Sequence, residues 1–319
     1  LFHMAEKKSK GQERYDELAY EKKNYFEVAS EEERAQMFAY AEGYKAFLDE
    51  AKTEREACAA AVRMAREAGF TEFKFGDKLS AGDKKYFVNR GKSVVVFRVG
   101  SENLEEDGLR IIASHIDAPR VDIKQNPLYE EAGMCFLKTH YYGGIKKYQW
   151  TTIPLALHGV VMLKDGRKVE LNVGEKADDP VFYIDDLLPH LGGEQMAKGG
   201  AKVIEGEQLN VAVGAMPYAD EDVKNKFKLT VLNYLNREYG MCEEDFLSAE
   251  ISAVPAFSAR DVGFDRALIG AYGHDDRVCA YPALTAVLNS ESKHTVLAML
   301  VDKEEIGSEG NTGMQCKIY

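Results

Sequence analysis

The sequence has few cysteines, no long apolar run and no recognisable leader. The cysteines are odd in number and scattered: Cys58, Cys135, Cys242, Cys279 and Cys316. No Cys-X-X-Cys pair occurs, so we expect neither a disulfide framework nor a zinc site made of cysteines, and free thiols favour a reducing cytoplasm. No apolar stretch approaches the roughly 20 residues that span a bilayer. We therefore expect no membrane partner and no signal peptide.

Basic residues are outnumbered by acidic ones, with 41 Lys and Arg against 53 Asp and Glu. The 319 residues carry a formal net charge of -12, and the acidic residues are spread along the chain rather than collected in blocks. This excess argues against nucleic acid as a partner. The length is sufficient for a large core and favours two domains.

What the sequence does contain is an apolar strand that ends in carboxylates. Residues Thr295 to Val301 read as the buried centre of a parallel sheet, and Asp302, Glu304 and Glu305 follow directly. Open α/β sheets place their ligands at the carboxyl ends of such strands. Adjacent carboxylates repel one another, so they favour a bound cation or a proton. A solvated strand end with two surface glutamates is the alternative.

A second polar strand end lies at Ser114-His115-Ile116-Asp117, after the mostly apolar segment Leu109 to Ala113. His115 and Asp117 are two residues apart and point to the same face of a strand. A histidine that binds a metal needs its ring held in one tautomer, which a nearby carboxylate commonly does. A surface His-Asp pair is the alternative.

A third polar turn, Gly273-His274-Asp275-Asp276-Arg277, separates a strand-like segment from a predicted helix over Arg277 to Asn289. Pro282 is expected in the first turn of that helix. An aspartate here can cap the helix, or it can bridge two cations through its two carboxylate oxygens. For Arg277 we expect a surface salt bridge, with neutralisation of the acidic site as the alternative. One sheet edge can bring all three motifs together.

The remaining pattern indicates an α/β fold with an insertion. Capping boxes at Ser30 and Thr53 predict helix starts, and residues 86–97 predict a β-hairpin. We expect a doubly wound, mostly parallel sheet formed by residues 1–120 and 253–319, with a β-rich domain over residues 121–252 inserted between them. Continuation of one large sheet is the alternative. His158 and His294 are expected at surface or turn positions.

Together these motifs resemble a known enzyme family. Ser114 to Pro119 (SHIDAP), the Asp275-Asp276 turn, Asp302 to Ser308 (DKEEIGS), and Tyr142-Gly143-Gly144 with Trp150 resemble the aspartyl aminopeptidase or aminopeptidase I family of dinuclear zinc exopeptidases. The four motifs in this order are specific for the family, although no single motif is.

The resemblance implies an activity and a set of roles. The activity is hydrolysis of the N-terminal residue of peptides by a metal-activated water. His115 and Glu305 would each bind one of two divalent ions, and Asp275 would bridge them. Zinc is the expected metal, with cobalt or manganese as alternatives. Glu304 would be the general base, and Asp117 would tune the site.

The resemblance also implies an assembly. The inserted domain would serve dimerisation, and the dimers would assemble into a tetrahedral dodecamer. His190 would reach the active site of a neighbouring subunit and help to stabilise the transition state there. From the residues alone, His190 is only a lone histidine in an amphipathic stretch.

Two departures from the family pattern matter. The family needs a further Asp ligand and a further His ligand after the Glu-Glu motif, whereas residues 306–319 contain neither type; we therefore expect that the sequence lacks a C-terminal part. Residues 151–157 are neutral where the family has an Arg-Asp pair, which leaves the preferred N-terminal residue open. A non-catalytic assembly or scaffold protein on a peptidase fold and a related deblocking metallopeptidase are the alternative functions.

Overall fold

A computed structural model describes residues 8–319 of the chain. The chain divides into two units, Leu1–Gly43 and Tyr44–Tyr319. The first unit contains α1 (Lys10–Leu18), α2 (Tyr25–Val28) and the start of α3 (Glu31–Glu50). The capping box predicted at Ser30 is present, because the Ser30 amide donates to Glu33 over 2.8 Å and the Glu33 amide donates back to Ser30 Oγ over 3.2 Å. The box therefore marks the start of α3, as predicted.

The second unit contains a five-stranded sheet in the order β1-β2-β3-β14-β4. Its strands are β1 (Thr71–Glu72), β2 (Lys84–Asn89), β3 (Ser93–Arg98), β4 (Leu109–His115) and β14 (Thr295–Val301). The predicted hairpin is confirmed as β2–β3. β14 pairs antiparallel with β3 and parallel with β4, and β1 pairs parallel with β2. The expectation of a mostly parallel sheet is therefore wrong: the sheet is mixed, because the antiparallel hairpin takes the place next to β14.

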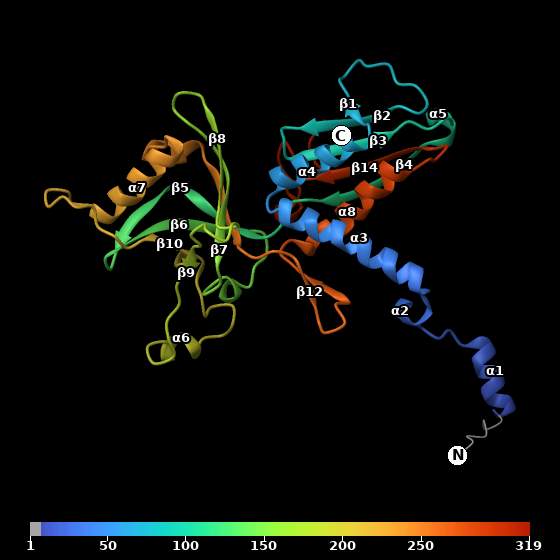
Figure 1. Ribbon diagram of the computed structural model, residues 1–319, viewed down its shortest axis with the longest axis horizontal. Helices are drawn as coiled ribbons and strands as arrows, with labels where there is room; N and C mark the ends of the chain where they lie inside the picture. The colour runs from blue at the N-terminus through green and yellow to red at the C-terminus, as the bar shows by residue number, and fades with distance from the viewer. Residues whose placement is uncertain (1–7) are drawn as a thin grey trace. The chain divides into compact units, whose positions relative to one another are not determined.

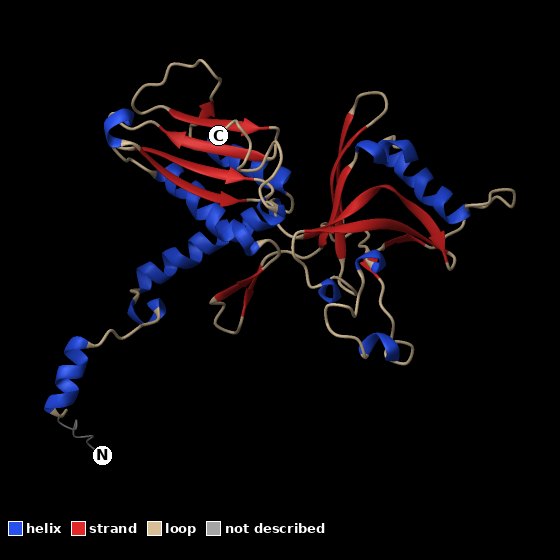
Figure 2. Cartoon of the chain, turned by 180° about the vertical axis from the view of Figure 1, so that it is seen from behind, coloured by secondary structure: helices blue, strands red, loops and turns tan. Residues whose placement is uncertain are grey.

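Long helices cover one face of this sheet (Figures 1 and 2). They are α4 (Glu54–Glu67), α8 (His274–Asn289) and the last residues of α3. The core between sheet and helices is formed by apolar side chains such as Leu48, Ala61, Val96, Leu284 and Leu300. Neither view shows a long helix on the other face within the described residues, so the doubly wound arrangement is not seen there.

A separate, antiparallel sheet of seven strands occupies the sequence between β4 and a hairpin formed by β12 (Arg260–Val262) and β13 (Leu268–Gly270). Its order is β8-β7-β11-β5-β6-β10-β9. The strands are β5 (Arg120–Glu131), β6 (Met134–Tyr142), β7 (Leu155–Met162), β8 (Lys168–Val173), β9 (Tyr183–Ile184), β10 (Val211–Gly214) and β11 (Glu250–Pro255). The alternative of one continuous large sheet is therefore wrong. The exact division into domains 1–120, 121–252 and 253–319 stays a prediction, and its first seven residues lie outside the described part.

This second sheet curls so that its β9 end returns to β7. Phe182, next to β9, forms an antiparallel bridge with Leu155 of β7, and their two backbone hydrogen bonds measure 2.8 and 2.9 Å. Helix α7 (Lys226–Tyr239) contacts β10, β5 and β6. Buried apolar residues such as Leu137 and Ile251 form a core that is separate from that of the first sheet.

The other elements are short. They are α5 (Leu104–Asp107), α6 (Gly193–Met196), the hairpin strands β12 and β13, and 3-10 turns such as η4 (Glu304–Ile306). Across the described residues, no helix combines the length and the apolar character that a bilayer crossing requires.

Candidate metal centre

The site is built where two parallel strands end side by side. Val301 of β14 is in register with His115 of β4, and the Ile116 amide donates to the Val301 carbonyl over 2.8 Å. Because the strands are parallel, their carboxyl ends share one sheet edge. The His115 motif and the Glu304-Glu305 motif therefore meet, although about 190 residues separate them.

Three side chains from distant parts of the chain converge at this edge. Ligand atoms of His115, Asp275 and Glu305 all lie within 4.8 Å of one another. The shortest of these distances that involves the imidazole joins His115 Nε2 to Asp275 Oδ1 and measures 3.1 Å. His115 is buried, Glu305 is partly buried and Asp275 is exposed. The structure thus brings together the three residues expected to bind metal.

Asp117 lies behind this cluster and holds its parts in place. Its side chain is fully buried. Its carboxylate accepts the backbone amides of Glu304 and Glu305, each over 3.2 Å. His115 Nδ1 lies 3.3 Å from Asp117 Oδ1 and 3.0 Å from the Asp117 carbonyl oxygen. Nδ1 therefore donates toward Asp117, which turns Nε2 toward Asp275 as the ring nitrogen that remains for a metal ion.

Tyr142, from the Tyr-Gly-Gly motif, is a part of the site for which the sequence indicated no role. Its hydroxyl donates to Asp117 Oδ2 over 2.7 Å. The guanidinium carbon of Arg120 lies 4.0 Å from the centre of the Tyr142 ring, and Arg120 is itself paired with the buried Glu54 over 3.1 Å. Burial raises the pKa of Asp117, but hydrogen bonds from His115 and Tyr142 outweigh it and keep the pKa below its ordinary value. Asp117 is therefore held as a charged acceptor.

The glycine after Tyr142 is required by the site. Gly143 has a φ of +72°, and a Cβ there would lie 2.8 Å from Glu305 Oε2. A side chain at this position would be strained by its backbone and would push Glu305 away. Gly144, by contrast, has open space around it. The Tyr-Gly-Gly sequence thus signals a close approach of backbone to Glu305.

The turn that carries Asp275 is anchored by a buried arginine. Arg277 is 0% exposed, and its Nη2 donates to the carbonyls of Ile116 over 3.0 Å and Lys52 over 3.2 Å. A Cβ on Gly273, whose φ is +83°, would lie 1.7 Å from Arg277 Nη1. The expected surface salt bridge is therefore wrong, because the guanidinium ties the Asp275 turn to the end of β4 from within the core.

The helix that follows this turn is close to its prediction. The backbone at Asp275 and Asp276 is non-helical, and the peptide bond between them is cis. Regular helix therefore begins at Arg277, as expected. Pro282 lies in the second turn rather than in the first.

The electrostatics of the cluster favour a bound cation. Burial raises the pKa of Glu305, and the negative charges of Asp117 and Asp275 add to this rise. Burial alone would lower the pKa of His115, but the hydrogen bond and charge of Asp117 outweigh it and raise the pKa to about 9. In the absence of a metal ion, a proton on His115 partly offsets the crowded carboxylates.

The donor set fits zinc. Zinc prefers imidazole nitrogen and carboxylate oxygen, and two ligand atoms on one tetrahedral ion lie about 3.3–3.5 Å apart. The 3.1 Å between His115 Nε2 and Asp275 Oδ1 is close to that value. Glu305 brings a second carboxylate, and thereby a third ligand, into the same cluster. Among the described residues, this is the one group of histidine, cysteine and acidic side chains with such spacing.

Glu304 and His190 differ in their relation to the cluster. Glu304 Oε2 lies 3.6 Å from His115 Nε2, and its side chain is 57% exposed, so it borders the cluster without being locked into it. His190 is exposed in the loop between β9 and α6. No hydrogen bond or ion pair joins it to the cluster in the described part of the chain. Its expected role in a neighbouring subunit stays a prediction.

His158 is not a surface residue, contrary to expectation. It lies within β7 and is 1% exposed. Its Nδ1 is 2.7 Å from Glu56 Oε1 on α4, and its Nε2 is 3.0 Å from Glu175 Oε1. Strand periodicity could not show this, because the carboxylate partner on α4 is about 100 residues away in the sequence. His294, by comparison, pairs with Glu102 at a partly exposed position.

The known proteins that resemble this chain in sequence and in structure belong to one family. The profile of the aminopeptidase I zinc metalloprotease family (M18) matches residues 47–319. A probable M18 family aminopeptidase 1 from Clostridium acetobutylicum is 46% identical over 309 residues, which cover 95% of this chain and 66% of that protein. The crystal structure of an M18 family aminopeptidase from Thermotoga maritima superposes with a TM-score of 0.89 and 44% identity, over 94% of this chain and 65% of that one.

A more distant structure, the mApe1 dodecamer from S. cerevisiae, shares the fold with a TM-score of 0.65 and 21% identity over 86% of this chain and 62% of that one. The chain thus spans about two thirds of the length of its relatives. The family profile covers most of the chain and includes each motif of the candidate centre. The chain therefore belongs to the aminopeptidase I zinc metalloprotease family, M18.

Proposed function

We propose that the chain belongs to a zinc aminopeptidase that removes the N-terminal residue of peptides. The observation that carries the proposal is the convergence of His115, Asp275 and Glu305 at the shared end of β4 and β14. Membership of M18 and 46% identity to a probable aminopeptidase support the same function.

Each residue has a task that its position permits. His115 offers Nε2, because its Nδ1 is turned toward Asp117. Asp275, whose side chain is 83% exposed, would bridge the two ions through its carboxylate. When bound, zinc would lower the pKa of a water and polarise the scissile carbonyl. Glu304 lies at the border of the cluster and would take the proton from that water and return it to the leaving amine.

Asp117 would act by orientation. Its buried carboxylate holds the His115 ring on one side and the amides of Glu304 and Glu305 on the other. A change at Asp117 would therefore alter a metal ligand and the proposed base together. This makes it a positioning residue, because it touches neither the water nor the peptide.

The relatives are about half again as long as this chain. That this chain hydrolyses peptides by itself is therefore also a proposal. We also propose assembly of dimers into a dodecamer, supported by the distant S. cerevisiae dodecamer of the same fold. In such an assembly the exposed His190 would be free to reach a neighbouring active site. A cytoplasmic location is supported by the five free cysteines.

Zinc titration of the purified chain tests the site. We expect His115→Ala and Asp275→Asn to weaken zinc binding by at least about tenfold, while Asp186→Asn, an exposed aspartate away from the cluster, leaves it unchanged. Equal zinc affinity in all variants would contradict the metal centre.

Turnover of aminoacyl-anilides by the zinc-loaded chain tests the activity. Hydrolysis of free but not N-terminally blocked substrates is expected. Preference for blocked substrates would instead identify a deblocking peptidase. Zinc binding and assembly without any turnover would support the scaffold alternative.

A further inference from the structure

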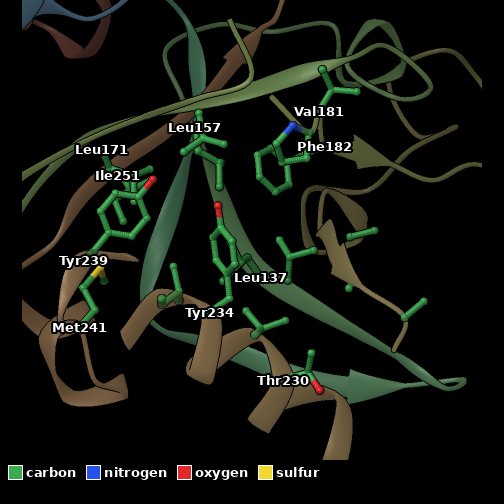
Figure 3. A pocket seen from close by; sticks show the side chains of 18 of the residues that line it. Leu137, Leu157, Leu171, Val181, Phe182, Thr230, Tyr234, Tyr239, Met241 and Ile251 are labelled. Carbon is green, nitrogen blue, oxygen red and sulfur yellow. The ribbon is translucent and has the colours of Figure 1, made fainter. Parts of the chain in front are cut away.

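An apolar cavity lies between α7 and the curled seven-stranded sheet, outside the metal centre. Its volume is about 540 Å³. Figure 3 shows Leu157 and Leu137 of the strands on one side of it and Tyr234 and Thr230 of α7 on the other. Small-molecule sites in proteins typically measure about 300–1,000 Å³ and have mostly apolar walls with a few polar groups. The cavity has the size and shape of such a site.

The lining has a distinctive composition. No charged side chain is among the described residues that line the cavity, and its polar side chains are Thr230, Tyr234 and Tyr239. The Thr230 hydroxyl is engaged, since it donates to the Lys226 carbonyl over 3.3 Å. The walls therefore exclude a charged ligand, because nothing inside would compensate the loss of its hydration.

The two tyrosines bring hydroxyl groups into this apolar space. In Figure 3 their rings are directed into the cavity from α7, and the Tyr234 hydroxyl points toward the strands. Neither hydroxyl has a hydrogen-bond partner among the described residues. Burial raises the pKa of Tyr239, so its hydroxyl keeps its proton and can donate. Tyr234 is 41% exposed, so a ligand acceptor at its hydroxyl would take a place that water can also reach.

Water is a poor occupant of this cavity. At about 30 Å³ per molecule, the volume corresponds to roughly 18 waters, and each needs two to four polar partners. Three hydroxyl-bearing side chains supply few of these partners, and the cavity is open to solvent, since the lining residues Val181 and Met216 are 42% and 72% exposed. The waters inside therefore bond mostly to one another and exchange with bulk water. An apolar ligand would displace this weakly held water, which favours its binding.

We propose that the cavity between α7 and the seven-stranded sheet binds an uncharged, mostly apolar small molecule that carries one hydrogen-bond acceptor, such as a neutral ester or ketone. The hydrocarbon part fills the space between Leu137, Leu157 and Phe182, and the acceptor receives the Tyr234 hydroxyl proton. This site is independent of the metal centre and of the proposed peptidase activity.

The test uses the neutral naphthalene ketone 6-propionyl-2-dimethylaminonaphthalene, whose fluorescence reports polarity and hydrogen bonding. We expect saturable binding of one molecule per chain and a higher unfolding temperature when it is bound. The negatively charged probe 8-anilinonaphthalene-1-sulfonate should bind at least about tenfold more weakly, because the cavity offers its sulfonate no partner.

Variants locate the binding. Ala212→Phe, which fills the cavity, should reduce the affinity of the ketone at least about tenfold. Ala197→Phe, at an exposed position outside the cavity, is the matched control. Thr230→Trp replaces Ala212→Phe if that variant does not fold. Tyr234→Phe should leave the chain folded but shift the bound emission to the blue, whereas Tyr218→Phe, outside the lining, should not.

Three results would overturn the proposal. The first is absence of saturable ketone binding to the unsubstituted chain. The second is binding that cavity-filling variants leave intact. The third is a change of oligomeric state on filling the cavity, measured by light scattering, since that would make a second copy of the chain the occupant.

Discussion

Tyr142 donates its hydroxyl proton to Oδ2 of Asp117 over 2.7 Å, and Asp117 in turn accepts the amides of Glu304 and Glu305. Tyr142→Phe removes only this donor and keeps the ring that stacks on Arg120. We expect zinc affinity to fall by about tenfold, because groups that orient metal ligands commonly contribute that much. Titration with zinc at fixed pH measures the effect.

A zinc-free measurement separates orientation from general destabilisation. In Tyr142→Phe the amides of Glu304 and Glu305 should exchange hydrogen faster, while the thermal unfolding temperature changes little. Tyr141→Phe is the matched control, because Tyr141 is the exposed neighbour on the same strand. Unchanged exchange in Tyr142→Phe would show that its hydrogen bond does not hold the acidic turn.

Gly143→Ala should displace Glu305. The added Cβ would lie 2.8 Å from Glu305 Oε2 at a φ of +72°. We expect a loss of about 1–2 kcal/mol in the free energy of unfolding from the backbone alone, together with weaker zinc binding. Gly144→Ala has open space around it and should change neither quantity. Equal behaviour of the two variants would contradict the close approach.

Glu304→Gln should separate metal binding from proton transfer. The side chain is 57% exposed and borders the cluster, so the amide should leave zinc affinity nearly unchanged. A general base commonly contributes about 10²–10⁴ in rate, so turnover should fall by that factor. Glu309→Gln, exposed a few residues further on, is the control. Full turnover in Glu304→Gln would remove Glu304 from the role of base.

His158 should make stability depend on pH. Burial lowers its pKa, but hydrogen bonds with Glu175 and Glu56 outweigh this and raise the pKa to about 9. A histidine with a raised pKa stabilises the fold fully below its unfolded pKa of about 6.5, and this stabilisation is lost as the pH rises through about 9. His158→Gln should therefore cost about 2–3 kcal/mol at pH 6 and much less at pH 10.

Urea unfolding of both proteins across this pH range measures the difference. His294→Gln is the comparison, since its pairing with Glu102 is partly exposed and should be worth less than about 1 kcal/mol. A His158→Gln difference that stays constant between pH 6 and pH 10 would show that the buried histidine is not charged.

The candidate centre could be predicted because each of its motifs is recognisable from a short stretch of sequence. The apolar run Thr295 to Val301 ends in carboxylates, and the strand before His115 ends in the same way. Parallel neighbours share an edge, so two such endings predict a meeting point without knowledge of the full topology. The capping boxes and the β2–β3 hairpin were predictable for the same reason.

Other features depend on partners far away in the sequence. The burial of Arg277 follows from the carbonyls of Lys52 and Ile116, and no periodicity around residue 277 indicates them. The mixed sheet arises because β3 pairs with β14, about 200 residues later. A sequence pattern predicts which residues form strands, but it does not determine which strands become neighbours.

The pairing of β5 with β11 also has a consequence for how the chain folds. Ser252 lies opposite Asp122, so the long segment between β4 and β14 leaves and re-enters at adjacent points. Closing a long loop costs more entropy than closing a short one. Once the seven-stranded sheet has formed, the effective connection between β4 and β14 is much shorter than the sequence between them and consists mainly of β12, β13 and α8. Early assembly of that sheet would therefore bring the two halves of the metal centre within reach of each other.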